Sequence, residues 1–245
     1  MKDNFSTISD KYAKFRPNYP QAIFDFLYPL LKEKQKAWDC GTGNGQIAQE
    51  LAKDFRQVEA TDISQSQLGH AHAADNIRYS LQAAESTNFE DDSFDLITVA
   101  QAVHWFDVDK FNEEVKRVSK SNGVIAIMGY ELNTITPEID QVIRRFYSDV
   151  IGKYWDSERK YLELKYQTIP FPFRELETPE IYNIKLWSFD NLIGYLKTWS
   201  AVRHFINANG YDPVNEISND LKNVWGSAEV RKVSFPILFR VGRVK

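Results

Sequence analysis

The chain has 245 residues, of which 43% are apolar and 26% are charged, and its formal net charge is −4. This length suits one large α/β domain, with or without an insertion, and the apolar fraction excludes a disordered chain. An acidic chain lacks the basic surface that phosphate neutralisation requires, so we expect no nucleic-acid partner. No apolar run approaches the roughly 20 residues that cross a bilayer, so we expect no membrane partner either.

The single cysteine, Cys40, has no partner for an internal disulfide, and the amino terminus lacks the apolar stretch of a secretory signal. We therefore expect a cytoplasmic protein, either a monomer or a homodimer. His70 and His72 are two residues apart, which places them on different faces of a predicted helix. The sequence therefore predicts no metal site.

Five β-prone runs alternate with helical segments over the first 130 residues. The clearest is the nearly continuous apolar run at 94–100, which is typical of a parallel strand buried on both faces. The other four runs are 36–40, 58–61, 77–81 and 123–129. This alternation predicts an α/β fold with a Rossmann-like, doubly wound, mostly parallel sheet, whose ligand lies beyond the carboxyl ends of the strands.

After residue 130 the alternation stops. Thr136-Pro137, Ser188 and Asp212-Pro213 are typical helix starts, and they predict a helical cap inserted after strand five. A sixth strand at 181–187 and an antiparallel final strand complete a sheet of seven. The predicted units are a Rossmann-like core with an amino-terminal lid segment at 1–130, a mainly helical cap at 131–225 and a closing strand at 226–245.

The first strand runs into a glycine-rich turn, DCGTGNG, at residues 39–45. Glycines at a strand-to-helix turn let the backbone approach a ligand closely. The third glycine of a dinucleotide-binding pattern would fall at position 46, where Gln46 stands, so the spacing disfavours a pyrophosphate. Asp62 ends the second strand, where a carboxylate is placed to accept both hydroxyl hydrogens of a ribose. The sequence therefore predicts a ribose-bearing cofactor.

The run WDCGTGNG at 38–45, together with Asp62 and the strand at 94–100, resembles the S-adenosylmethionine-binding signature of class I methyltransferases. The segment YAKFRPNYP at 12–20, the His104-Trp105 pair and LKTWS at 196–200 resemble the type 11 group, which includes trans-aconitate methyltransferase-like proteins. This resemblance implies S-adenosylmethionine as the cofactor and S-adenosylhomocysteine as its product.

The resemblance also implies roles for single residues in binding the cofactor. Gly41 and Gly43 would pass under the methionyl part, Asp62 would hold the ribose hydroxyls, and Ile63 would lie against adenine. Arg16 would either pair with the methionyl carboxylate or remain a solvated surface charge. Asp39 would orient the loop or the ammonium group, and Glu85 or the Ala84 backbone would meet the exocyclic amine of adenine. Ala100 and Gln101 would line the region near the sulfonium, and Gly45 is the remaining expected contact.

For the acceptor, the candidate catalytic residues are His104, Tyr12 and Tyr19, and the candidate binding residues are His104, Trp105, Trp199 and Arg203. His104 follows the fourth strand and would act as a base or hold the acceptor, unless Asp107 simply satisfies it. The tyrosines would close over the methyl group or pack the amino-terminal loop. Trp105 would wall the pocket or fill the core, and Arg203 would reach an acidic acceptor or lie on a solvated helix face.

Aromatic residues gather in the second half of the chain, with 15 of them between 146 and 211. Many must fill a second core layer, and as a group they predict an apolar cap over the transferred methyl group. The resulting hypothesis is methyl transfer in line to a small molecule, with a carboxylate or hydroxyl expected and an amine or carbon atom left open. The alternatives are a nicotinamide-dependent oxidoreductase and a noncatalytic S-adenosylmethionine-binding protein.

Overall fold

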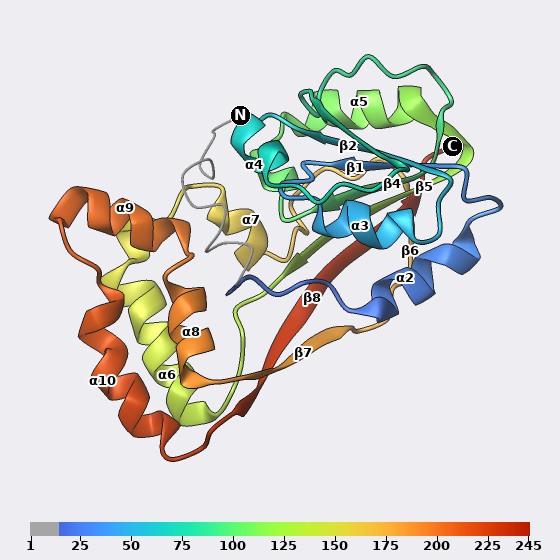
Figure 1. Ribbon diagram of the computed structural model, residues 1–245. Coiled ribbons are helices and arrows are strands. Elements are labelled where there is room, and N and C mark those ends of the chain that lie inside the picture. Colours follow the sequence, from blue (N-terminus) through green and yellow to red (C-terminus); the bar gives the residue numbers. More distant parts are fainter. Residues whose placement is uncertain (1–14) are drawn as a thin grey trace.

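One mixed β-sheet forms the centre of the molecule, as the computed structural model shows for residues 15–245 (Figure 1). Its strands lie in the order β3-β2-β1-β4-β5-β8-β6, and β7 also pairs with β8. The strands are β1 (Lys36–Cys40), β2 (Gln57–Asp62), β3 (Ile77–Leu81), β4 (Phe94–Ala100), β5 (Ser119–Tyr130), β6 (Arg174–Leu176), β7 (Tyr182–Trp187) and β8 (Arg231–Arg243).

The first five strands are parallel, and each matches one of the predicted runs. Their side chains alternate between two apolar layers. On β4, Ile97 and Val99 pack on the face covered by helix α5 (Val108–Val118). Leu96 packs on the opposite face, which is covered by α2 (Gln21–Leu27) and α3 (Gln46–Ala52). Because both faces are covered, β4 is buried through nearly its whole length, as its continuous apolar sequence predicts.

Strand β8 is antiparallel to β5, which confirms the predicted antiparallel final strand. It is long enough to pair on its other side with two strands in turn, because Pro236 lies opposite Tyr182 of β7 and Arg243 lies opposite Arg174 of β6. The sheet thus has eight strands rather than seven. The additional strand, β6, has only three residues and is defined by its pairing with the end of β8. No local sequence pattern therefore predicts it.

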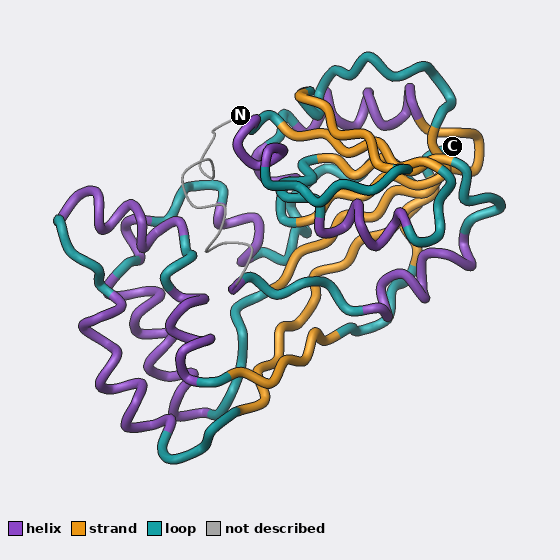
Figure 2. The backbone as a smooth tube through the Cα atoms, in the orientation of Figure 1, coloured by secondary structure: helices purple, strands orange, loops and turns teal. Residues whose placement is uncertain are grey.

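Four helices gather beyond the sheet, next to the outer ends of β7 and β8 (Figures 1 and 2). Their apolar faces enclose Val233 and Phe235 of β8, both fully buried. Two of the predicted helix starts are confirmed as side-chain caps, because Thr136 Oγ1 and Ser188 Oγ each accept a backbone hydrogen bond from the third residue after them. These helices are α6 (Pro137–Arg145), α8 (Phe189–Leu196), α9 (Ser200–Asn209) and α10 (Val214–Trp225).

The other α-helices of the described residues flank the parallel strands or the site: besides α2, α3 and α5, they are α4 (Gln65–Gly69) and α7 (Arg159–Glu163). Ser64 is the side-chain cap of α4, and this helix ends at Gly69 without continuing through Ala71 and Ala74. Ala74 is exposed, so no apolar contact holds a longer helix together. Within residues 15–245, no helix is long and apolar enough to cross a membrane.

Candidate functional site

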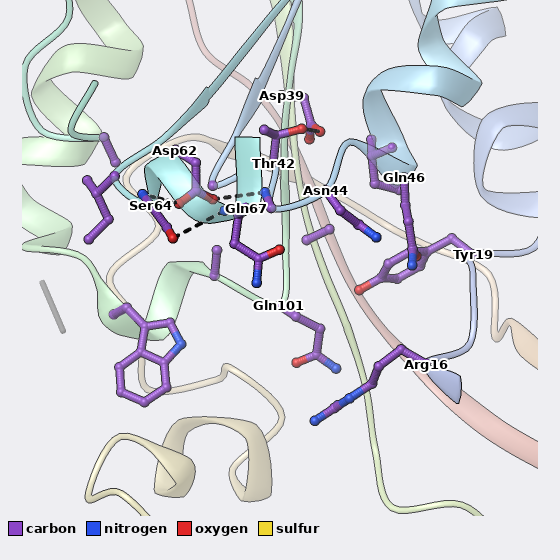
Figure 3. Close-up of a pocket in the computed structure, with 18 of the residues that line it drawn as sticks. Arg16, Tyr19, Asp39, Thr42, Asn44, Gln46, Asp62, Ser64, Gln67 and Gln101 are labelled. Carbon is purple, nitrogen blue, oxygen red and sulfur yellow. Dashed lines mark hydrogen bonds between the residues drawn. The ribbon is translucent and has the colours of Figure 1, made fainter. Parts of the chain in front are cut away.

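A deep hollow, called here the first hollow, opens at the carboxyl ends of β1, β2 and β4 (Figure 3). The glycine loop forms one wall, the turn after β4 forms another, and the segment at 16–19 lies across from them. Its lining residues are Arg16, Pro17, Tyr19, Asp39, Gly41, Thr42, Gly43, Asn44, Gln46, Ile47, Asp62, Ile63, Ser64, Gln67, Gln82, Ala84, Ala100, Gln101, Ala102, Trp105, Phe106 and Tyr130.

The three glycines of the loop all have left-handed backbone angles, with φ of +68° at Gly41, +57° at Gly43 and +84° at Gly45. A Cβ atom on Gly41 would lie 2.6 Å from Ala102 Cβ, and one on Gly45 would meet the Tyr79 hydroxyl. A Cβ on Gly43 would meet nothing closer than Gln67 Oε1 at 3.9 Å, so it would project into the hollow. The glycines therefore serve packing at two positions and ligand approach at the third.

Asp62 joins the end of β2 to this loop. Its Oδ2 accepts a hydrogen bond from the Gly43 amide at 2.8 Å, and its Oδ1 accepts one from the Ser64 amide at 2.9 Å. These two bonds fix the orientation of the carboxylate at the edge of the first hollow, which Asp62 lines.

Asp39 braces the loop from beneath. It is 1% exposed, and its carboxylate accepts hydrogen bonds from the hydroxyls of Thr42 and Thr98 and from the Ala48 amide. Burial raises the pKa of Asp39 to about 6 in spite of these three donors. Because the donors come from the loop, β4 and α3, Asp39 ties together the elements that shape the hollow.

Most of the remaining expected cofactor residues line the first hollow: Ile63, Ala84, Ala100 and Gln101. Gln101 has a left-handed φ of +55°, and its backbone amide donates to Met128 O at 2.9 Å. Two other expected residues, Gly45 and Glu85, do not line the first hollow. Gly45 is the N-cap residue of α3. The Glu85 side chain instead accepts a hydrogen bond from the Asp107 amide at 2.9 Å.

Arg16 closes the far side of the first hollow, opposite Asp62 in Figure 3. Its guanidinium donates to the Tyr130 hydroxyl at 2.8 Å and to Thr198 O at 3.2 Å, and it lies 5.6 Å from the centre of the Tyr195 ring. Arg16 is therefore a fixed part of the wall rather than a solvated charge.

A second hollow adjoins the first and shares four residues with it. It reaches toward helices α7, α8 and α9, and three of the 15 aromatic residues between 146 and 211 line it. The shared residues are Arg16, Gln101, Trp105 and Tyr130; the others are His104, Glu131, Trp155, Asp156, Arg159, Leu162, Tyr195, Trp199 and Ser200.

His104 lines the second hollow and is almost fully buried, with 7% of its surface exposed. Its Nδ1 lies 3.2 Å from the Tyr166 hydroxyl, and its ring contacts Trp105. Burial, and after it the positive charge of Arg159, lowers the pKa of His104 to about 3. The imidazole is therefore neutral over the physiological pH range. The hydrogen-bond partner of His104 is Tyr166 and not Asp107, whose carboxylate accepts from the Lys110 amide instead.

Of the other residues expected to contact the acceptor, some line the hollows and some do not. Trp105 and Trp199 line the second hollow, and Tyr19 lines the first. Arg203, on α9, lines neither of them. Tyr12 lies outside the described residues.

The sequence reasoning missed several lining residues. In the first hollow these include Asn44 in the glycine-rich turn, Gln67 on α4 and Gln82 directly after β3. In the second hollow they include Asp156 and Arg159, near the start of a five-residue helix that carries no motif. In the part of the chain that the structure describes, no group of three His, Cys, Asp or Glu side chains is placed to hold a metal ion.

Comparison with known proteins places this site in a family. A family model described as a methyltransferase domain, type 11, matches residues 38–127. A candidate methyltransferase of Dictyostelium discoideum is 37% identical over 96% of this chain and 92% of its own length. Thus similarity extends well beyond the segment that carries the glycine loop.

Solved structures agree. A candidate type II methyltransferase from Anaeromyxobacter dehalogenans has 39% sequence identity and a TM-score of 0.87, covering 94% of this chain and 98% of that one. A candidate methyltransferase from Bacillus halodurans has a TM-score of 0.52 at 18% identity, covering 91% and 97%, and shares the fold. The chain belongs to the class I S-adenosylmethionine-dependent methyltransferases, in the group that carries the type 11 methyltransferase domain.

Proposed function

We propose that the first hollow binds S-adenosylmethionine and that the second hollow binds a small-molecule methyl acceptor. The observation that carries this proposal is that the two hollows are contiguous and share Arg16, Gln101, Trp105 and Tyr130. Two reactants bound on either side of these residues would meet at the junction, and such positioning is worth on the order of 7–11 kcal/mol in well-oriented reactions.

The residues of the first hollow fit this cofactor. The Asp62 carboxylate is oriented by two backbone amides and lines the hollow, and a carboxylate is an acceptor suited to ribose hydroxyls. Gly43 leaves open space where a side chain would intrude, which suits the methionyl part. Ile63 and Ala84 offer apolar surface for adenine. Asp39 is better assigned to orienting the loop than to contacting an ammonium group, because three protein donors already surround it.

When bound, the cofactor supplies an electrophilic methyl group, whose S–CH3 bond breaks as the acceptor's new bond forms, leaving the electron pair on sulfur. A carboxylate acceptor arrives ionised, whereas a hydroxyl must also release a proton. A histidine with a pKa of about 3 takes up a proton poorly at neutral pH. We therefore assign His104 to holding the acceptor, and we favour a carboxylate over a hydroxyl.

We further propose that residues 131–225 form an acceptor-binding cap on a core of residues 1–130, with 226–245 closing the sheet. Support comes from the second hollow, where Trp155, Tyr195 and Trp199 come from the helical part and Trp105 comes from the turn after β4. Aromatic rings on both sides keep water from the transferred methyl group. Other rings of the aromatic-rich stretch, such as the fully buried Phe146, fill the helical core instead.

The binding part of this proposal is tested by calorimetry with S-adenosylhomocysteine. We expect micromolar affinity for the protein and a loss of at least about ten-fold in Asp62→Ala, since hydrogen bonds to a charged group contribute about 1.5–3 kcal/mol. Asp75→Ala is the matched control, because Asp75 is exposed and lines neither hollow. Equal affinity in both variants would refute the ribose assignment.

Turnover separates the remaining alternatives. Incubation of the protein with methyl-labelled S-adenosylmethionine and pooled metabolites is expected to yield a labelled small molecule. Cofactor binding without any labelled product would favour a noncatalytic binding protein. A nicotinamide-dependent oxidoreductase is disfavoured by Gln46, which stands where a dinucleotide loop needs glycine, and titration of NADH fluorescence is expected to show no binding.

A further inference from the structure

Arg159 is held in the second hollow by aromatic residues. Its Nε donates to the Tyr147 hydroxyl at 2.8 Å, and its guanidinium carbon lies 4.6 Å from the centre of the Trp155 ring and 5.3 Å from that of Tyr147. The Tyr147 hydroxyl in turn donates to Glu163, which leaves its oxygen lone pairs for Arg159. The guanidinium plane is therefore fixed on one edge, while the two terminal nitrogens remain on the other.

Those terminal nitrogens have no hydrogen-bond partner within residues 15–245. Among the described residues, Arg159 forms no ion pair, and neither of its Nη atoms donates to another group. Arg16, the other cation of this hollow, already donates to Tyr130 and to Thr198 O. A half-buried guanidinium with two donors directed away from protein acceptors is a ready partner for an anion.

The acidic residues that line the same hollow do not neutralise Arg159. Glu131 forms an ion pair with Lys165 at 3.0 Å. Asp156 has one buried carboxylate oxygen, 3.9 Å from His204 Nδ1 and without a hydrogen-bond partner in residues 15–245. A bound acceptor would thus meet the guanidinium of Arg159, which suits an anionic group. It would also meet the buried carboxylate oxygen of Asp156, which suits a hydrogen-bond donor.

We propose that Arg159 binds an anionic group, a carboxylate or a phosphate, of the methyl acceptor and so determines which class of acceptor the enzyme uses. The inference rests on the proposed function, because it takes the second hollow as the acceptor site. The planar fork of arginine matches both anions through paired hydrogen bonds. The neutral His104 imidazole adds a hydrogen-bonding group nearby without adding charge.

A metabolite extract is first separated by anion exchange into an anionic fraction and a neutral-plus-cationic fraction, and each fraction is then incubated with the protein and methyl-labelled S-adenosylmethionine. The separation thus sorts acceptors by their own charge, not products, because a carboxylate loses its charge when it is methylated. An aliquot of the anionic fraction is treated with phosphatase before the incubation, which distinguishes a phosphate source from a carboxylate source. The proteins compared are the unmodified chain, Arg159→Met, Arg159→Lys and the control Lys160→Met. Lys160 is the exposed neighbour of Arg159 and lines neither hollow.

We expect label to enter the anionic fraction, with a rise in KM of about ten-fold or more in Arg159→Met and an intermediate rise in Arg159→Lys, which keeps the charge but not the fork. Lys160→Met is expected to behave like the unmodified chain. All variants should bind S-adenosylhomocysteine within about two-fold of one another, which separates loss of the acceptor contact from misfolding.

Two results would overturn the assignment: label that enters only the neutral-plus-cationic fraction, or an Arg159→Met variant with unchanged KM for the anionic acceptor. In either case methyl transfer itself would stand. Absence of label from both fractions would instead contradict the proposed function, and the Arg159 assignment with it.

Discussion

The amide of Gly43 donates a hydrogen bond to Asp62 Oδ2 at 2.8 Å, and this bond joins the glycine loop after β1 to the end of β2. Two motifs that are 19 residues apart in the sequence thereby become one wall of the first hollow. Because this bond couples the two, we expect a substitution in either the loop or Asp62 to disturb the position of the other.

Gly43→Ala is expected to weaken binding of S-adenosylhomocysteine, because its methyl group would enter the hollow. Overpacking costs about 1–3 kcal/mol, and the left-handed backbone adds about 1–2 kcal/mol to the loss of folding stability. Calorimetry and urea unfolding measure the two effects. Gly210→Ala is the control: it has φ of +80° and no atom within 4 Å of the added Cβ, so it should lose stability and keep its affinity.

His104→Asn is expected to change how stability depends on pH. The folded-state pKa of His104 is lowered to about 3 from 6.5, so the unfolded chain binds the extra proton between these values. The contribution of His104 to the free energy of unfolding is therefore present above about pH 6.5 and is lost as pH falls, by at most about 1.4 kcal/mol per pH unit.

Urea unfolding at a series of pH values checks this expectation. His104→Asn should show a shallower loss of stability below about pH 6.5 than the unmodified chain. Tyr166→Phe removes the hydroxyl next to His104 without removing the titrating group, so the steep loss should remain. The methyl-transfer rate should show no inflection from His104 near neutral pH, and an inflection that disappears in His104→Asn would contradict the buried, neutral state.

Thr98→Val removes one hydroxyl donor from the buried Asp39 carboxylate, to which it donates at 2.9 Å. The pKa of Asp39 is about 6 in the folded, unmodified chain. Loss of a hydrogen bond to the ionised carboxylate should raise this folded-state pKa in the variant. The variant should therefore lose about 1–3 kcal/mol at about pH 8, where the carboxylate is ionised, and less at about pH 5. Thr98→Ser keeps the hydroxyl, and its stability loss should be similar at both pH values.

Ser188→Ala removes the cap of α8. The Ser188 hydroxyl accepts from the Asn191 amide, and the Asn191 side chain accepts in return from the Ser188 amide at 3.2 Å. The expected cost is about 1 kcal/mol in the free energy of unfolding, measured with urea. Affinity for S-adenosylhomocysteine should not change, since neither residue lines the first hollow; a large loss of affinity would show that α8 supports the cofactor site.

Much of the fold could be read from local pattern. The parallel strands, the caps at Ser64, Thr136 and Ser188 and the left-handed loop glycines depend on hydrogen bonds and burial among near neighbours, which the sequence encodes directly. The short strand β6 could not be read in this way, because only its pairing with β8 defines it.

The candidate site divides in the same manner. Asp62 is predicted from its position at the end of the second strand and Gly43 from the glycine-rich turn and the family resemblance, and both line the first hollow. Glu85 was also predicted, yet the Asp107 amide, 22 residues away, engages its carboxylate, a contact that depends on how the turn after β4 packs.

The sequence by itself determined the family, the parallel core and the loop and carboxylate expected to hold the cofactor, because these are set by short motifs with fixed geometry. Only the tertiary structure decided what surrounds the acceptor. Arg159 enters the second hollow because Tyr147 and Trp155 hold its side chain there, and His104 is neutral because distant elements bury it. Burial and electrostatic environment arise from packing between segments far apart in the chain, so no local pattern records them.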